Sequence, residues 1–309
     1  MKIFLAMIPA FFWGTTYAVT KVALPDWPPL LLGALRALPA GLLLLLIKPN
    51  LPKKADWGIL FQLSMINIAI FFSLIFVMAL TLPSTISGVG MVALPVFAIL
   101  YDWVVNKHSP NKTQAFFGLL LIILAWQLFD PNTINLNPAG LLAMLAALLC
   151  IVYGSSMTKS LGRRIHWWSI LTWQLIIGGS ILMVAAVINA FITPTDYLHA
   201  VQHFQLSNGL GLLWIIVLNT VIGYALYVWL LQKMSVVDFT FAGIANPVAG
   251  ITVGILLLGE SFTSTQYLLM GCMILASLMP QIIEIVKNYS GLDIEVAPQE
   301  TNCKESPVI

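Results

Sequence analysis

Long apolar stretches separated by short polar breaks run through most of the chain, as in residues 31–47 and 139–153. A run of roughly 17–25 apolar residues is long enough to cross a bilayer as a helix. Helix is favoured there because no water is present to bond exposed backbone amides. We therefore predict an all-α polytopic membrane protein with ten transmembrane helices. The expected spans are residues 3–21, 29–47, 57–80, 84–105, 112–129, 138–158, 167–192, 210–232, 237–258 and 265–286.

The composition supports this interpretation and narrows the partners. Hydrophobic residues make up 60% of the sequence and charged residues 8%, which leaves too little polar surface for a soluble globule. A formal net charge of +2 gives no basis for binding nucleic acid. The expected partners are therefore the lipid bilayer and a small-molecule substrate.

The basic residues gather on one side of the membrane when the spans are counted from a cytoplasmic N-terminus. Only Lys21, at the outer end of the first span, and Arg36, within the second, depart from this pattern. Basic residues favour the cytoplasmic side, so an even number of spans with both termini in the cytoplasm is predicted. The residues assigned to that side are Lys2, Lys48, Lys53, Lys54, Lys107, Lys112, Lys159, Arg163, Arg164, Lys233, Lys287 and Lys304.

The chain divides into two membrane halves and a tail. We assign five helices each to residues 1–130 and 138–286, and a disordered cytoplasmic tail to the polar residues 287–309. A cleaved signal peptide at the start is disfavoured because its loss would leave an odd number of spans. The spacing of Cys150, Cys272 and Cys303 suggests neither a disulfide nor a metal site.

The two halves resemble each other in sequence. Residues 87–100 align with residues 239–252, which places Pro95 opposite Pro247. Because five is an odd number, the second half would enter the membrane inverted, as in many secondary transporters. The alternative is a duplication that only enlarged the bundle. Further matches pair Trp13-Gly14-Thr15-Thr16 with Tyr153-Gly154-Ser155-Ser156, Arg36 with Gln174, and Thr113-Gln114 with Thr265-Gln266.

These features resemble the EamA branch of the drug/metabolite transporter superfamily, with similarity to its pigment-exporter-like members. The resemblance covers residues 3–285 and rests on the repeats, the Trp-Gly-Thr element, Arg36 and the segment PVAGITVGILLLGE at 247–260. It implies a ten-helix inner-membrane carrier with a central cavity, active as a monomer. The first half departs from the family pattern by having Asn106-Lys107 where members often have Gly-Glu.

Polar and aromatic residues within the first span are candidate substrate contacts. Trp13 and Tyr17 are four positions apart and share one helical face, beside Thr16. Tyr153 and Ser155 occupy the matching helix of the second half. If the two helices face each other, they form an aromatic-walled cavity suited to a flat, amphipathic or cationic solute. The alternative is a packing seam between helices.

Arg36 is a cation within a span, where charge is costly unless it has a partner or a cavity. It could bind a substrate carboxylate or join a structural network, and a third interpretation has it extend to the outer interface. Its match to Gln174 keeps a hydrogen-bonding group at the equivalent depth, which favours an inward-facing position.

Further candidates lie on the third, fourth, eighth and ninth spans. Pro95 and Pro247 are expected to kink their helices at a hinge or gate, since proline removes a backbone hydrogen bond. Direct ligand contact by these prolines is the alternative. Additional substrate-binding candidates are Ser73, Met91, Tyr224 and Asn246.

The predicted function is secondary transport of a small organic metabolite by alternating access, with export as the expected direction. Neither catalytic residues nor a cofactor are expected, and the sequence contains no phosphate-binding GxxxxGK[ST] loop. The alternative is a non-transport membrane protein, either an embedded enzyme or a structural or sensory bundle. His199 and His203 in the expected outer loop 193–209 could bind a metal if helical, but a solvated loop is the preferred interpretation.

Overall fold

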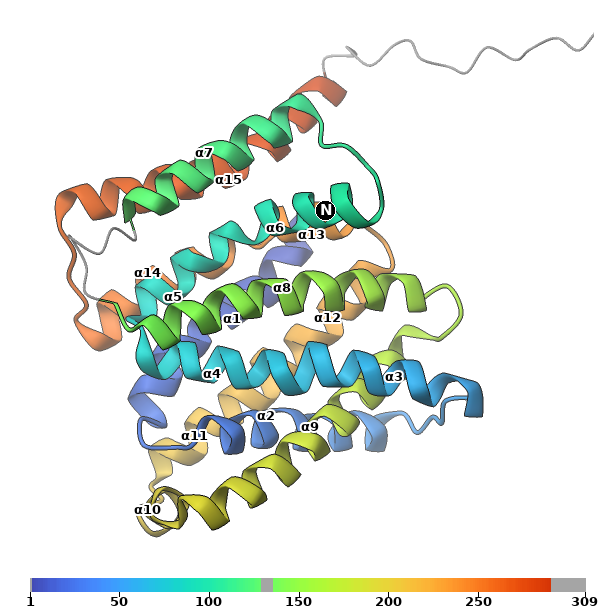
Figure 1. The fold of residues 1–309 in the computed structure, drawn as a ribbon, viewed down its shortest axis with the longest axis vertical. Coiled ribbons are helices and arrows are strands. Elements are labelled where there is room, and N and C mark those ends of the chain that lie inside the picture. Colours follow the sequence, from blue (N-terminus) through green and yellow to red (C-terminus); the bar gives the residue numbers. More distant parts are fainter. Residues whose placement is uncertain (1, 129–135, 290–309) are drawn as a thin grey trace, which may run out of the picture.

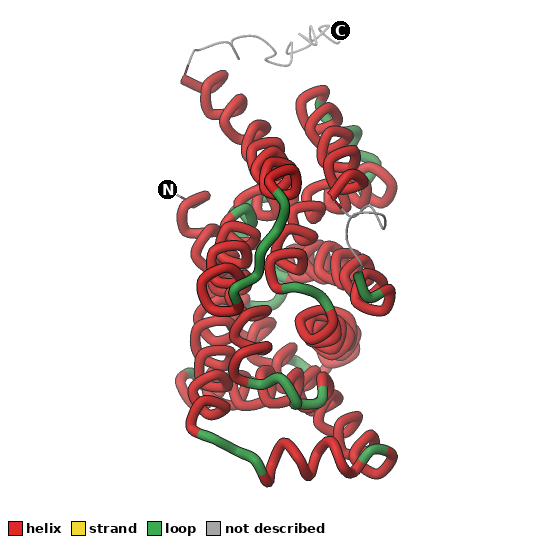
Figure 2. Tube along the Cα trace, turned by 90° about the vertical axis from the view of Figure 1, so that its left-hand side faces the viewer, coloured by secondary structure: helices red, strands yellow, loops and turns green. Residues whose placement is uncertain are grey.

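The structure is a computed structural model that describes residues 2–128 and 136–289. Side chains are described except at residues 2, 3, 281, 284, 285 and 287–289. Within this part of the chain every regular element is a helix, as Figures 1 and 2 show. The all-α prediction is thus confirmed for the described residues. The assignment of a tail falls mainly on residues 290–309, outside them, although helix continues to Tyr289.

The first half comprises α1 (Lys2–Ala23), α2 (Pro29–Ile47), η1 (Lys54–Asp56), α3 (Trp57–Ser64), η2 (Met65–Ile70), α4 (Phe71–Thr81), α5 (Ser84–Gly90), η3 (Met91–Ala93), α6 (Leu94–Val105) and α7 (Lys112–Leu128). The second half comprises α8 (Pro138–Leu161), α9 (Trp167–Ile192), α10 (Pro194–Gln202), α11 (Leu206–Trp214), η4 (Ile215–Ile222), α12 (Gly223–Leu231), α13 (Val236–Ala242), α14 (Ala245–Leu258) and α15 (Ser264–Tyr289).

Seven helical stretches of the described chain are long and apolar enough to cross a membrane. Two shorter apolar helices, Lys112–Leu128 and Ser264–Pro280, accompany them, and α1 covers the first predicted span. The seven stretches are Pro29–Ile47, Lys54–Thr81, Ser84–Val105, Pro138–Leu161, Trp167–Ile192, Leu206–Leu231 and Val236–Leu258.

The long helices run side by side between two ends of the bundle (Figure 1). The end that carries α10 is called the α10 face. We call the opposite end the basic face, because the helix ends next to Lys48, Lys107, Arg163 and Lys233 lie there. Helices α7 and α15 pack together at one edge of the bundle, as Figures 1 and 2 both show.

Local sequence signals explain where helices begin and end. Asn137 caps α8 by accepting hydrogen bonds from the amides of Ala139 and Gly140, and a proline follows at the first helical position. Gly259 ends α14 in the left-handed conformation, with φ 63°. Residues 193–209 were expected to form a loop, but α10 occupies most of this segment because Pro194 can start a helix.

Four departures from regular α-helix interrupt the predicted spans. The π-helices η2 and η4 lie within the third and eighth spans. The fourth span is interrupted by η3, and the ninth by a turn between α13 and α14. Pro95 and Pro247 follow these two interruptions directly. Both spans therefore depart from regular α-helix shortly before these prolines, and the role of Pro95 and Pro247 as a hinge or gate stays a prediction.

The same local geometry recurs in both halves. Asn111 and Gln114 exchange reciprocal side-chain-to-amide hydrogen bonds before α7, at 3.2 and 2.8 Å. Thr263 and Gln266 do the same before α15, at 2.9 and 3.3 Å. Each pair is a capping arrangement that begins a helix. The match of Gln114 with Gln266 in the sequence is therefore also a match in structure.

The structure corrects the alignment at the end of the fourth span. Lys107 has a left-handed backbone with φ 62°, as Gly259 has with φ 63°. The interval that separates Pro95 from Pro247 also separates Lys107 from Gly259. His108, rather than Lys107, is therefore the counterpart of Glu260. The earlier pairing of Asn106-Lys107 with Gly-Glu was shifted by one position.

Helices α2 and α9 cross at a contact that leaves no room for a side chain. A Cβ atom on Gly179 would lie 2.6 Å from the backbone nitrogen of Leu38. Small residues permit such approaches in membranes, where helices are held by close packing and hydrogen bonds. This crossing joins the second helix of the first half to the matching helix of the second half.

We predict that Gly179→Ala lowers the free energy of unfolding by about 1–3 kcal/mol, because the α2 backbone must move. The matched control is Gly118→Ala on α7, where nothing lies within 4 Å of an added Cβ atom. The control should be neutral or stabilising by up to ~1 kcal/mol. Unfolding of both variants in detergent checks this, and equal effects would contradict the close crossing.

Candidate functional site

Four aromatic rings from three helices form a cluster in the middle of the bundle. Trp13 of α1 lies 5.3 Å, between ring centroids, from both Tyr224 and Tyr227 of α12. Phe239 of α13 lies 5.3 Å from Tyr227. Tilted and edge-to-face contacts of this kind are favourable for aromatic pairs. Both tyrosines are buried, and in this conformation the rings of the cluster pack against one another.

The π-helix η4 anchors the α1 side of this cluster. The Nε1–H of Trp13 donates to the backbone carbonyl of Asn219 at 2.9 Å. The side-chain amide of Asn219 donates to Oγ1 of Thr16 at 2.6 Å. The wider π-helical turn therefore offers both a carbonyl and an amide to α1. Trp13 and Thr16, both predicted contacts, are brought together here.

Arg36 is buried beside the same π-helix, with a fractional exposure of 3%. Its Nε–H donates to Oγ1 of Thr220 at 3.0 Å, and that hydroxyl donates to the carbonyl of Ile215 at 2.9 Å. Its Cζ lies 4.2 Å from the ring centroid of Phe72 and 5.9 Å from that of Tyr224. Neither ion pair found in the described chain includes Arg36. A hydroxyl and aromatic faces surround the cation, so it does not extend to the interface.

Gln174 makes the corresponding contact in the other half. The side-chain amide of Asn67, within η2, donates to Oε1 of Gln174 at 2.9 Å. Thus α2 bonds to the π-helix of the second half, and α9 bonds to the π-helix of the first half. The matched pair Arg36 and Gln174 is inward-facing, as predicted.

The motif on α8 reaches the cluster through Tyr227. The hydroxyls of Ser155 and Tyr227 share a hydrogen bond of 2.7 Å. Tyr153 instead contacts the Tyr101 ring, with centroids 6.2 Å apart, and accepts a hydrogen bond from Gln62 at 3.2 Å. The prediction that the two motifs face each other directly needs correction, because Tyr227 of α12 lies between Trp13 and Ser155.

The remaining candidates differ in their relation to the cluster. The side chain of Asn246 faces the Tyr17 hydroxyl, and both residues are buried. Met91 lies in η3 and packs in the same core. The hydroxyl of Ser73, in α4, donates to the carbonyl of Ala69 in the preceding η2 at 2.8 Å. Ser73 is therefore not brought to the aromatic cluster by any described hydrogen bond.

Several buried polar atoms near the cluster have no hydrogen-bond partner among the described residues. A buried polar atom normally has a partner, so these atoms are candidates for contacts with water or a ligand. They are Asn67 Oδ1, Gln174 Nε2, Asn219 Oδ1, Tyr224 Oη and Asn246 Oδ1.

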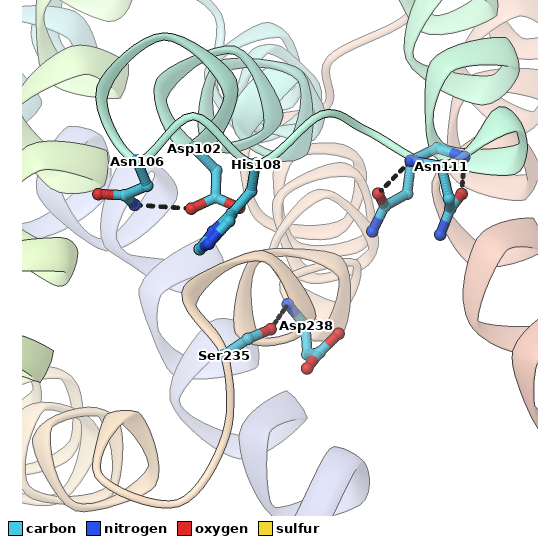
Figure 3. Close-up of polar contacts among 7 residues, drawn as sticks. Asp102, Asn106, His108, Asn111, Ser235 and Asp238 are labelled. Carbon is cyan, nitrogen blue, oxygen red and sulfur yellow. Dashed lines mark hydrogen bonds and ion pairs between the residues drawn. The ribbon is translucent and has the colours of Figure 1, made fainter. Parts of the chain in front are cut away.

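A cavity of about 500 Å³ opens at the basic face between α6, α8 and α13. Figure 3 shows part of its rim, with His108 pointing toward Asp102. Its lining mixes apolar side chains with charges of both signs. The lining residues are Ala98, Tyr101, Asp102, Asn106, His108, Ser156, Lys159, Ser160, Arg163, Ser235, Val236 and Val237.

Sequence reasoning missed this rim, although two of its charges were visible. Asp102 lies inside the predicted fourth span and Lys159 follows the sixth directly. Charged residues at such depth need a partner or water. The cavity gives these two residues access to water. Their positions within or next to predicted spans were the signal in the sequence that could have identified the rim.

The described residues offer no group of three or more His, Cys, Asp or Glu side chains suited to a metal ion. His199 and His203 are on α10, with ring centroids 4.2 Å apart. The segment is helical, which was the condition set for a metal site, yet the two rings stack on each other.

Comparisons with known proteins agree on the family. The model of the EamA-like transporter family matches residues 1–128 and 138–279. Protein PecM of Dickeya dadantii is 31% identical over 260 residues, covering 82% of this chain and 83% of that protein. The uncharacterized inner membrane transporter YedA of Escherichia coli K12 is 24% identical over 275 residues, covering 85% of each.

Two further comparisons extend the picture. A probable amino-acid metabolite efflux pump of Escherichia coli K12 is 24% identical over 277 residues, covering 85% of this chain and 89% of that protein. A solved crystal structure aligns with a TM-score of 0.64 at 12% identity, over 91% of this chain and 96% of the other. The latter likeness concerns the fold alone.

We predict a coupling energy of about 0.6–1.7 kcal/mol between Thr16 and Asn219, which spans the average and the maximum measured for hydrogen bonds between helices of a membrane protein. A double-mutant cycle of Thr16→Val and Asn219→Ala, read by unfolding in detergent, measures it. Thr81→Val, whose hydroxyl bonds its own helix, replaces Thr16→Val in the control cycle and should be additive with Asn219→Ala. Additivity of the first pair would contradict the anchoring contact.

Proposed function

The chain belongs to the EamA-like transporter family, and on this premise we propose that it is a secondary transporter that moves a small organic metabolite by alternating access. The observation that carries the mechanism is the difference between the two faces. A cavity of about 500 Å³ opens at the basic face, while α5 and α14 are in contact near the α10 face. A further hollow at the α10 face is lined by residues such as Asp26, Trp27 and His199, and its lining includes no residue of α5 or α14. Matched helices that meet at one face and lie apart at the other are what one state of such a cycle requires.

The proposed architecture is ten transmembrane helices in two inverted five-helix repeats. Its support is the recurrence of unusual geometry at matched positions. Asn67 and Asn219 each lie in a π-helix, and Pro95 and Pro247 each follow a helix break. The reciprocal contacts of Arg36 with η4 and of Asn67 with Gln174 relate the two halves in the same way.

We propose that substrate enters from the cavity and moves toward the aromatic cluster. Ser156 lines the cavity, while the adjacent Ser155 bonds Tyr227 of the cluster. Phe239 of the cluster follows Val236 and Val237 of the cavity wall on α13. Aromatic faces beside side-chain amide atoms that lack a hydrogen-bond partner suit an amino acid, a derivative, or an aromatic or cationic compound. The efflux-pump relative supports this class.

Arg36 is proposed to orient an anionic group of the substrate once the cluster opens. Its Nε–H is engaged by Thr220, and the described ion pairs do not include it. A cation without a carboxylate partner can recruit one from a ligand. Movement at the helix breaks next to Pro95 and Pro247 is the proposed means of opening.

The basic face is proposed to lie in the cytoplasm of a cell whose inner membrane holds the protein. The basic residues at the helix ends support this orientation. The inner-membrane relative supports the choice of membrane. Both termini would then be cytoplasmic. Export is the proposed direction of transport, and the relative described as a probable efflux pump supports it. We propose a functional monomer. An enzyme or sensory bundle finds no support in the relatives whose names indicate a transporter or an efflux pump.

We predict that Trp13→Ala lowers saturable counterflow into liposomes by about tenfold, the effect of losing ~1.4 kcal/mol of binding free energy. Amino acids, nucleobases, aromatic metabolites and quaternary amines form the substrate panel. Trp126→Ala is the matched control, since that ring is 84% exposed on α7. Normal counterflow in the Trp13 variant would remove the aromatic site, and absence of counterflow in the parent protein would contradict transport of this class.

A further inference from the structure

The contact between α5 and α14 at the α10 face is held by one carboxylate. Oε1 of Glu260 accepts from the amide of Ser84 at 2.6 Å, and Oε2 accepts from the amide of Thr85 at 2.8 Å. Hydrogen bonds to an ionised acceptor are stronger than neutral ones. The left-handed Gly259 places Glu260 just beyond the end of α14. We call this contact the Glu260 latch.

Close helix packing accompanies the latch. A Cβ atom on Gly88 of α5 would lie 3.1 Å from Cα of Gly250 on α14, so the two backbones are in contact. The hydroxyls of Ser84, Thr85 and Ser87 are buried there without a partner among the described residues. Leaving hydroxyls unbonded is unfavourable. The latch therefore holds closed a surface that would gain hydrogen bonds if water entered.

The basic face has the same backbone with a different side chain. The interval between Pro95 and Pro247 relates Glu260 to His108, and it relates Ser84 and Thr85 to Val236 and Val237. Lys107 holds the left-handed position of Gly259 before His108, at φ 62° against 63°. His108 thus occupies the place from which Glu260 reaches across in the other half.

In this conformation His108 is away from its counterpart contact. Its Nδ1 lies 3.4 Å from Oδ2 of Asp102, which also accepts a hydrogen bond from Asn106 through Oδ1 at 2.6 Å. The cavity lined by His108, Val236 and Val237 lies at this position (Figure 3). No hydrogen bond from the Val236 or Val237 amide occurs in the described part of the chain.

We propose that His108 is the second latch of an alternating pair and that the inequality of the two latches sets the resting conformation. When the basic face closes, His108 leaves Asp102 and accepts one hydrogen bond, from the amide of Val236 or of Val237, while Glu260 releases Ser84 and Thr85. A neutral imidazole has one acceptor nitrogen, whereas a carboxylate has two oxygens and a charge. The carrier therefore rests closed at the α10 face and open at the basic face. This inference rests on the proposed alternating access.

Cysteine labelling tests this inference without any substrate. One reporter is Ser156→Cys in the cavity, and the other is Ser87→Cys, buried at the α10 face, each in a chain whose native cysteines are replaced. N-ethylmaleimide labelling should be fast at the first reporter and slow at the second. His108→Glu strengthens the basic-face latch and Glu260→Gln weakens the other. Each should raise the ratio of Ser87→Cys to Ser156→Cys labelling at least about fivefold, the lower end for coupled equilibria.

The control is Ser109→Glu, which adds the same charge at the neighbouring exposed position and should leave the labelling ratio unchanged. An unchanged ratio in His108→Glu, or an equal shift in Ser109→Glu, overturns the role of His108. If His108→Glu does not fold, Glu260→His replaces it in the test. That variant places a histidine at both latch positions, so the ratio of Ser87→Cys to Ser156→Cys labelling should rise. Saturable counterflow by the parent protein with unchanged labelling ratios would defeat the latch alone, whereas missing counterflow would defeat the proposed function.

Discussion

Inside a membrane, a polar group that a helix leaves unbonded must find its partner within the protein or in a water-filled cavity. In this chain the departures from regular helix provide such partners between the two halves. The π-helix η4 accepts hydrogen bonds from Trp13 and Arg36 of the first half. The π-helix η2 donates through Asn67 to Gln174 of the second half. Irregular backbone and buried side chains therefore satisfy each other, and this exchange of hydrogen bonds joins the two halves.

The close crossing of α2 and α9 makes that exchange possible. Because Gly179 has no side chain, the backbone of α9 approaches Leu38 of α2 directly. Arg36 and Gln174, which lie on these two helices, can then reach the π-helix of the opposite half. The aromatic cluster around Trp13 forms on this frame, since η4 also anchors Trp13 and continues into α12. Packing and polar contacts are thus parts of one arrangement.

The candidate site was predictable in part. Trp13 and Thr16 were expected on one polar segment of the first span, and both contact Asn219. The match of Arg36 with Gln174 favoured an inward-facing position, and both residues are buried. The sequence did not indicate that Tyr227 lies between the two matched motifs, because helical periodicity describes faces of one helix and not its neighbours. The rim of the cavity was missed for the same reason, since Asp102, Lys159 and Ser235 come from three separate helices.

The sequence by itself determined the helical class, the approximate helix limits, the resemblance between the two halves and the gathering of basic residues at one end. These properties depend on local physics: the length of apolar runs, proline and glycine positions, and caps such as Asn137. Only the tertiary structure decided that Glu260 bonds α5 while His108 remains beside Asp102. Both residues follow a left-handed position of the same kind, so local preference cannot distinguish them. The distinction arises because the helices meet at one face and separate at the other, which depends on how distant segments pack.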